Sequence, residues 1–273
     1  MQDIKYEKLK EILANAGSLA VAYSGGTDST LVLKVAHDAL GDKVVAITAV
    51  SASLPDADRV EAEEIARQIG AKHMLIESEE TSNSEYLANT PNRCFFCKKE
   101  TYGKLSAYAR QYGFQTIVDG TNADDIGDYR PGRQAAHDFN VRSPLLEAGF
   151  TKDEIRQLAR KLGLQNWNKP AAACLSSRIP YGTVITLEAL SQVERAEVLL
   201  RGLGLRQLRV RHHGQVARIE AEPDDFQILL NHRDQIVTGL KTIGYAYVAL
   251  DLSGFRSGSM NDVIRVQPAD KQP

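Results

Sequence analysis

Cysteine, tryptophan and long apolar runs are scarce in this sequence. Its 273 residues include three cysteines and one tryptophan. A small, odd number of cysteines argues against a disulfide framework and favours a role in metal binding or catalysis. No apolar run approaches the length needed to span a membrane, and residues 1–15 form a charged amphipathic stretch unlike a signal peptide. We therefore expect a cytoplasmic protein without a membrane partner.

Neither sign of charge dominates the composition. Lysine and arginine number 33, whereas aspartate and glutamate number 35, which gives a formal net charge of −2. Such a chain has no overall attraction for nucleic acid, so we do not expect a nucleic-acid partner. The length allows either one large domain or one medium domain together with a small one.

A glycine-rich turn separates the apolar run 19–23 from a helical pattern that begins at Asp28. Adjacent glycines let the backbone approach an anion closely, and the free N–H groups at the start of a helix point into the turn. Asp28 suits a catalytic Mg²⁺ held beside phosphates. An ordinary turn with a capped helix would show the same spacing. The residues that we expect to bind nucleotide phosphates are Ser24, Gly25, Gly26, Asp28 and Ser29.

Short β-rich runs alternate with helical patterns from residue 18 to about residue 120. We expect strands at 19–23, 44–49, 73–76 and 116–119, and helices at 28–40, 56–69 and 98–112. This alternation predicts an α/β fold with a doubly wound, mostly parallel sheet. Ligands of such sheets bind at the carboxyl ends of the strands. Gly120, Asn122 and Asp125 follow a strand there and are candidates for nucleotide and magnesium contacts, although a solvated acidic turn is the alternative.

The second half predicts a different architecture. A capping-box helix starts after Thr151, and residues 164–184 then lack periodicity. A helix at 187–203, strands at 207–211 and 216–220, a helix at 223–243 and a strand at 245–251 follow, which predicts a smaller C-terminal α+β domain. We therefore divide the chain into a domain at 1–168, a linker at 169–184 that carries Cys174, and a substrate or oligomerisation domain at 185–273.

Two groups of residues in this half are candidates for substrate anions. Arg209 and Arg211 alternate in a strand and so face the same side, where two guanidiniums can hold a phosphomonoester. Ser177 and Arg178 directly follow Cys174 and could bind a carboxylate or phosphate. A solvated strand face and an unremarkable loop are the respective alternatives.

The cysteines are Cys94 and Cys97, in a C-x-x-C within the loop-like segment NRCFFCKK, and the distant Cys174. Three thiolates suit a 4Fe-4S cluster in which one iron has no protein ligand and can bind sulfide. A zinc site would need a fourth ligand, and no histidine shows a convincing spacing. Zinc, a redox dithiol and uncoordinated thiols stay open from spacing alone.

The turn at residues 24–29 resembles the SGGxDS signature of the PP-loop ATP pyrophosphatases, which cleave ATP to AMP and pyrophosphate. Longer stretches from both halves resemble the LarE family of ATP-dependent sulfur transferases. The matching stretches are AYSGGTDSTLVLK, DGTNADDIGDYRPG, NWNKPAAACLSSRIPYGT, RVRHH, ARIE and LDLSGFRSG. The resemblance implies that a pyridinium-3,5-biscarboxylic acid mononucleotide is converted, through an adenylated carboxylate, to the bisthiocarboxylic precursor of the nickel-pincer cofactor of lactate racemase.

The three cysteines resemble one branch of that family. For this branch the resemblance implies a 4Fe-4S cluster on Cys94, Cys97 and Cys174, a sulfide on its open iron, and Mg²⁺ with ATP. In the other branch a single cysteine is sacrificed, so sulfur donation by Cys174 is an alternative. The resemblance also implies that Arg209 and Arg211 bind the substrate phosphate. A cluster-dependent tRNA thiolase and an ATP-binding module with structural zinc are the remaining alternatives, and we expect a homo-oligomer.

Overall fold

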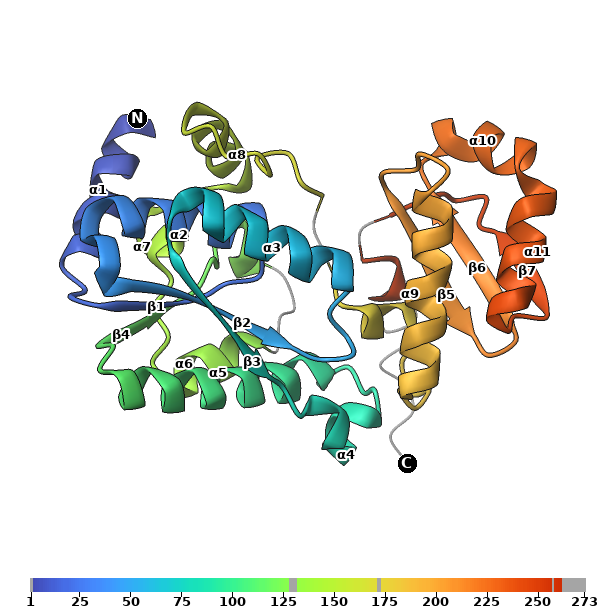
Figure 1. Cartoon of the computed structure of the whole chain (residues 1–273), viewed down its shortest axis with the longest axis horizontal. Coiled ribbons are helices and arrows are strands. Elements are labelled where there is room, and N and C mark those ends of the chain that lie inside the picture. Colours follow the sequence, from blue (N-terminus) through green and yellow to red (C-terminus); the bar gives the residue numbers. More distant parts are fainter. Residues whose placement is uncertain (1, 128–131, 171–172, 257, 262–273) are drawn as a thin grey trace. The chain divides into compact units, whose positions relative to one another are not determined.

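The computed structural model describes residues 2–127, 132–170, 173–256 and 258–261 (Figure 1). The chain forms two compact units. Unit 1 comprises Met1–Asn83 and Asn92–Ala172, and unit 2 comprises Ser84–Pro91 and Ala173–Pro273. The segment 84–91 thus leaves unit 1 and packs with the C-terminal part of the chain. No helix within the described ranges is long and apolar enough to cross a membrane.

Unit 1 is built on a parallel sheet of four strands in the order β3-β2-β1-β4. The strands are β1 (Leu19–Ala22), β2 (Val44–Val50), β3 (Lys72–Glu77) and β4 (Thr116–Val118). Leu19 pairs with Val44 on one side and with Thr116 on the other. Strands β2 and β3 therefore lie on one side of β1, and β4 lies on the other. A ligand crevice is expected where the strand order reverses, at the carboxyl ends of β1 and β4. The predicted doubly wound parallel sheet is confirmed.

Helices cover both faces of this sheet (Figure 1). Val21 and Ala46 face a core that includes Leu31 of α2, whereas Ala20 and Ile47 face a core that includes Leu105 of α5. This alternation follows from the two-residue period of a strand. The helices of unit 1 are α1 (Gln2–Ala14), α2 (Thr27–Leu40), α3 (Asp56–Ile69), α5 (Arg93–Tyr112), α6 (Gly132–Asp138), α7 (Pro144–Ala148) and α8 (Lys152–Lys161), with 3-10 turns at Gly41–Lys43, Glu80–Ser82 and Ala123–Gly127.

Helix α5 begins earlier than the sequence predicted. The segment NRCFFCKK was interpreted as a loop, but α5 starts at Arg93 and includes both Cys94 and Cys97. Arg93 is buried, and the helix continues to Tyr102, Leu105 and Ala109, which pack beneath the sheet. Burial of residues on both sides of the cysteine pair stabilises the helical conformation of the residues between them. Helix propensity alone did not indicate this.

Unit 2 contains a mixed sheet in the order β5-β6-β7, with β5 and β6 antiparallel and β6 and β7 parallel. Its strands are β5 (Leu208–His213), β6 (Val216–Ala221) and β7 (Tyr247–Leu250), and its helices are α4 (Ser84–Leu87), α9 (Leu187–Arg201), α10 (Phe226–Asn231) and α11 (Arg233–Ile243). Its 3-10 turns lie at Leu175–Arg178, Pro223–Asp225 and Ser259–Asn261. The sheet and α9 and α11 enclose one apolar core. The predicted α+β arrangement is confirmed.

Two local predictions in unit 2 were wrong. The single helix expected at 223–243 is a 3-10 turn followed by α10 and α11, with a break at His232. The break lets Leu229 of α10 and Ile236 of α11 both reach the core. Strand β5 also continues through His212 and His213 to a tight turn at Gly214, whose φ of +61° favours glycine.

Candidate active site

The phosphate-binding loop lies between β1 and α2. Gly26 is the N-cap of α2, and the Thr30 amide donates to the Gly26 carbonyl at 3.0 Å. The Ser29 hydroxyl lies 3.1 Å from the Ser24 hydroxyl and also accepts from the Ser24 amide at 3.2 Å. The loop is therefore tied to the first turn of the helix. Amides and hydroxyls at the start of a helix are the donors that bind an anion.

Close backbone approach explains two glycines of the site. Gly25 has φ +69°, and a Cβ on it would lie 2.7 Å from the Cβ of Ala62 in α3. A Cβ on Gly120, which follows β4, would lie 2.7 Å from the Ser29 amide nitrogen. The segments after β1 and β4 thus meet directly, as the predicted crevice requires.

Asp28 has two partners from other segments. Its carboxylate accepts from Asn122 Nδ2 at 3.3 Å and from Lys152 Nζ at 2.5 Å. Lys152 is the first residue of α8, and the capping box formed by Thr151 and Glu154 fixes the start of that helix. The sequence predicted Asp28 and Asn122 but missed Lys152, because a contact between residues 124 positions apart leaves no local pattern.

The acidic side chains of the segment after β4 accept hydrogen bonds from nearby backbone amides. Asp125 is buried and accepts from the Asn122 amide at 3.0 Å. Asp124 accepts from the Lys152 amide at 2.7 Å. Asn122 Oδ1 in turn accepts from the Asp124 amide at 3.0 Å, so each of these three side chains bonds a backbone amide of the site. Residues 128–131, which belong to the matching stretch DGTNADDIGDYRPG, lie outside the described residues.

Asp119, at the end of β4, organises the floor of this crevice. It accepts from the Tyr102 hydroxyl at 3.1 Å, the Thr121 hydroxyl at 2.9 Å and the Ser143 hydroxyl at 2.8 Å. Burial, with a contribution from the Asp119 carboxylate that the Lys98 ammonium opposes, raises the pKa of Tyr102 to about 12. Tyr102 therefore stays a neutral donor, and it links α5 to β4.

The three cysteines are free thiols. Cys94 is exposed and Cys97 is half-buried in the first turn of α5, in unit 1, whereas the half-buried Cys174 belongs to unit 2. No cluster of three or more potential metal-binding side chains occurs within the ranges that the structure describes. As a donor set, three partly accessible thiols without a disulfide fit an iron–sulfur cluster with one open iron.

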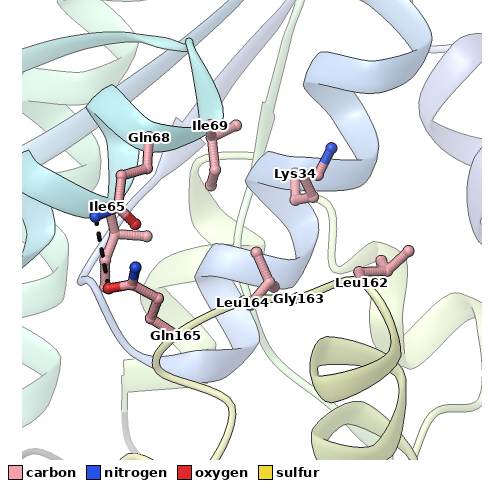
Figure 2. Close-up of a pocket in the computed structure, with 8 residues that line it drawn as sticks. All are labelled: Lys34, Ile65, Gln68, Ile69, Leu162, Gly163, Leu164 and Gln165. Atoms are coloured by element: carbon pink, nitrogen blue, oxygen red, sulfur yellow. Dashed lines mark hydrogen bonds between the residues drawn. The ribbon is translucent and has the colours of Figure 1, made fainter.

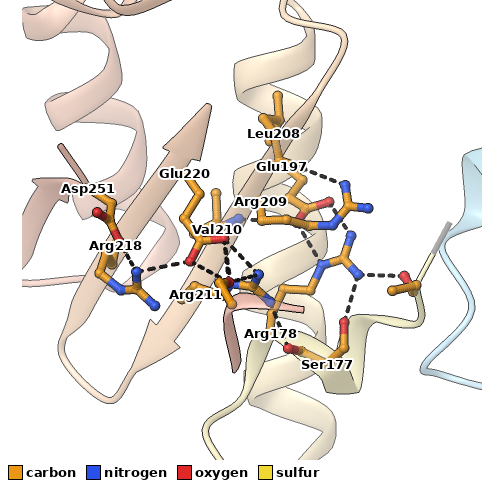
Figure 3. A network of polar contacts seen from close by, with 12 residues as sticks. Ser177, Arg178, Glu197, Leu208, Arg209, Val210, Arg211, Arg218, Glu220 and Asp251 are labelled. Atoms are coloured by element: carbon orange, nitrogen blue, oxygen red, sulfur yellow. Dashed lines mark hydrogen bonds and ion pairs between the residues drawn. The ribbon is translucent and has the colours of Figure 1, made fainter. Parts of the chain in front are cut away.

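Hydrogen bonds from Ser177 and Arg178, whose side chains Figure 3 shows, hold the backbone of Cys174. Its carbonyl accepts from the Ser177 amide at 3.0 Å, the Ser177 hydroxyl at 2.8 Å and Arg178 Nη1 at 2.9 Å. Arg178 is itself buried and forms an ion pair with Glu197 through Nε at 2.8 Å and Nη2 at 3.0 Å. These contacts fix the turn that carries the thiol.

The predicted arginine pair is on the strand face away from the apolar core of unit 2, next to Arg178 (Figure 3). Arg211 donates to Glu220 at 2.7 and 2.9 Å and to the Ser177 carbonyl at 2.9 Å. Arg209 lies 5.2 Å from the centroid of the Phe255 ring. Burial lowers the pKa of Arg209 to about 10, and the nearby charge of Arg178 contributes to this shift. This region thus carries concentrated positive charge.

No family model matches the chain. It is 46% identical to an uncharacterized Synechocystis protein, over 97% of this chain and 99% of that protein. It is 41% identical to the pyridinium-3,5-bisthiocarboxylic acid mononucleotide synthase of Lactiplantibacillus plantarum, over 95% of each chain. A tRNA-specific 2-thiouridylase of Rickettsia felis is 27% identical over 56% of this chain and 52% of its own.

The parallel sheet, its phosphate-binding loop and these relatives define the class as a PP-loop ATP-dependent enzyme. Within that class, the chain belongs to the LarE-like family of PP-loop ATP pyrophosphatases.

Proposed function

We propose that this chain is an ATP-dependent sulfur transferase that converts the carboxylates of pyridinium-3,5-biscarboxylic acid mononucleotide to thiocarboxylates. The product would be the precursor of the nickel-pincer nucleotide. The observation that carries the proposal is the 41% identity to a pyridinium-3,5-bisthiocarboxylic acid mononucleotide synthase over 95% of both chains. The tRNA thiouridylase matches only about half of each chain, and a net charge of −2 offers nucleic acid no overall attraction.

The first step is activation of the carboxylate. A substrate carboxylate oxygen attacks the α-phosphorus of ATP, the bond to the β-phosphate oxygen breaks, and pyrophosphate leaves. The amides of the loop between Ser24 and Ser29 receive the charge of pyrophosphate. Asp28, which the Asn122 side chain orients by donating to it, would hold Mg²⁺, and the Lys152 ammonium beside Asp28 adds a second positive charge there.

The second step replaces oxygen with sulfur. A sulfur nucleophile attacks the carbonyl carbon of the adenylate, and AMP leaves with the former carboxylate oxygen. Cys94, Cys97 and Cys174 would hold the 4Fe-4S cluster, which would supply the sulfide when bound. The turn fixed by Ser177 and Arg178 would keep Cys174 in place for this role.

The substrate phosphate would bind near Arg209 and Arg211. Three guanidiniums, those of Arg178, Arg209 and Arg211, lie among two carboxylates, those of Glu197 and Glu220, and all five residues are at most 7% exposed. This local surplus of positive charge favours a phosphate dianion. Arg178 and Arg211 each pair with a carboxylate and with a carbonyl of the Cys174 turn, so the phosphate would share Arg211 with Glu220.

An anaerobic assay tests both halves of the proposal. The chain loaded with iron and sulfide should release AMP and pyrophosphate only when the pyridinium mononucleotide is present, and mass spectrometry should show oxygen replaced by sulfur. Absence of substrate-dependent pyrophosphate would overturn the function. Iron and sulfide should be lost equally from Cys94→Ala, Cys97→Ala and Cys174→Ala. Activity lost only in Cys174→Ala, with no iron in the wild type, would replace the cluster with sacrificial donation by Cys174.

A further inference from the structure

Residues 163–170 pass behind the phosphate-binding loop, and we call them the rear segment. They follow α8, and the first three of them, residues 163–165, line a groove with Lys34 of α2 and Ile65 of α3 (Figure 2). Lys169, near the end of this segment, is 2.9 Å from Asp58 and 2.8 Å from Glu61, both in α3. Burial would lower the pKa of Lys169, but its contacts with Glu61 and Asp58 outweigh burial and raise it. The rear segment is therefore fastened to the helix that packs on Gly25.

Asn166 of the rear segment contacts the loop directly. Its Nδ2 donates to the Gly25 carbonyl at 3.0 Å and to the Thr30 hydroxyl at 2.9 Å. The backbone carbonyl of Asn166 accepts from the Thr27 hydroxyl at 2.7 Å and from the Lys169 amide at 3.0 Å. Asn166 is 3% exposed, so these bonds form away from bulk water. One side chain thus reaches the loop and the first turn of α2.

The bond to the Gly25 carbonyl determines which way an amide points. In a planar trans peptide the C=O and the following N–H point in opposite directions. Because Asn166 holds the Gly25 oxygen on the rear side, the Gly26 N–H points to the opposite side, where it lies 3.4 Å from the Ser24 hydroxyl. The Ser24 hydroxyl on that side is 3.1 Å from the Ser29 hydroxyl, and we expect the phosphates to bind on this side of the loop.

This peptide unit needs such a restraint. It joins two glycines, which lack the Cβ that restricts other residues, so rotation of the whole unit is easy. A rotated unit would place the Gly25 oxygen, with its partial negative charge, where pyrophosphate must bind. We propose that Asn166 is a positioning residue that prevents this rotation and keeps the Gly26 amide directed at the phosphates of ATP. The inference rests on the use of ATP by this loop.

Three variants distinguish positioning from simple packing. Asn166→Asp has nearly the same volume but places a carboxylate oxygen against the Gly25 carbonyl, so it should favour the rotated peptide. Asn166→Ala only removes the restraint. We therefore expect Asn166→Ala to weaken binding of ATP and of pyrophosphate about tenfold, and Asn166→Asp to weaken it further. A packing role predicts the reverse order, because alanine leaves the larger cavity.

Binding is measured by calorimetry, and folding by thermal unfolding. Asn89 of unit 2 provides a matched control, because it is 0% exposed and donates to three backbone carbonyls. Asn89→Asp should lower the unfolding temperature but leave pyrophosphate affinity unchanged. If Asn166→Asp does not fold, Thr27→Val removes only the hydroxyl that holds the Asn166 carbonyl and should weaken pyrophosphate binding about threefold.

The Gly26 amide gives a second measurement. Its NMR resonance should shift when pyrophosphate is added to the wild type and should shift much less in Asn166→Ala. Wild-type affinity in both Asn166 variants, or a milder effect of aspartate than of alanine, overturns the role of Asn166. A wild type that binds neither ATP nor pyrophosphate overturns the proposed function as well.

Discussion

The phosphate-binding loop is held in place by side chains from distant parts of the chain. Its two adjacent glycines and Asp28 lie at the start of α2. Lys152 and Asn166 reach the same loop from segments more than 120 residues away. No periodicity or motif spacing encodes such contacts, so only the fold reveals them.

Gly25→Ala should lower the free energy of unfolding for two reasons, the positive φ of Gly25 and its close approach to Ala62. The positive φ alone costs an L-residue about 1–2 kcal/mol. The contact with Ala62 adds an overpacking cost of about 1–3 kcal/mol. Gly113→Ala is the matched control, since Gly113 has φ +75° and no atom within 4 Å of its added Cβ. Urea unfolding should show a larger loss of stability for Gly25→Ala, and equal losses would mean that the Ala62 contact is unimportant.

Lys152→Met should impair the use of ATP while preserving the fold. The substitution removes the ammonium beside Asp28, and a charge-assisted contact of this kind corresponds to a roughly ten- to hundredfold decrease in kcat/KM for ATP. Lys161→Met removes a lysine whose side chain is 67% exposed at the other end of α8 and should leave kcat/KM unchanged. A similar decrease in both variants would contradict a specific role for Lys152.

At the scale of elements, the type of each helix and strand was easier to predict than its ends. The apolar periods of α2, α3 and the four parallel strands follow the sheet that buries them. The start of α5 and the break at His232 depend instead on which distant surfaces are buried, namely the sheet for Tyr102 and the core of unit 2 for Ile236. The ends of these helices therefore depend on which residues are buried in a core, and local propensity does not fix them.

Helix α8 differs from these elements, because the capping-box pattern of Thr151 and Glu154 predicts its first residue from the sequence. The Thr151 hydroxyl accepts from the Glu154 amide, and the Glu154 carboxylate accepts from the Thr151 amide at 2.9 Å. Thr151→Ala should cost about 1 kcal/mol of stability. Since Lys152 is the first residue of the same helix, this variant should also weaken ATP binding, whereas Thr151→Ser should restore both. Thermal unfolding and calorimetry measure the two effects, and a loss of stability without any change in ATP affinity would separate the cap from the site.

For the whole molecule, three histidines make stability sensitive to mildly acidic pH. Burial lowers the pKa values of His73, His212 and His213, and the charge of Arg218 lowers that of His213 further. His73 lies beneath the loop through Thr48, whose hydroxyl is 2.8 Å from His73 Nε2 and donates to the Tyr23 carbonyl at 2.7 Å. Since that hydroxyl has one proton, His73 Nε2 donates to it. The folded protein therefore favours neutral imidazoles.

The unfolded chain, with histidine pKa values near 6.5, then binds more protons than the folded chain at mildly acidic pH. Stability should be greatest above about pH 6.5 and should fall as the pH decreases toward the lowered folded-state pKa values. Thermal unfolding between pH 8 and pH 5 measures this slope. His73→Gln retains a donor to Thr48 and should reduce the slope, whereas His137→Gln alters a side chain that is 86% exposed and should not. A slope that is unchanged in His73→Gln would show that the acid sensitivity arises elsewhere, and the two histidines of unit 2 would then be the next substitutions to measure.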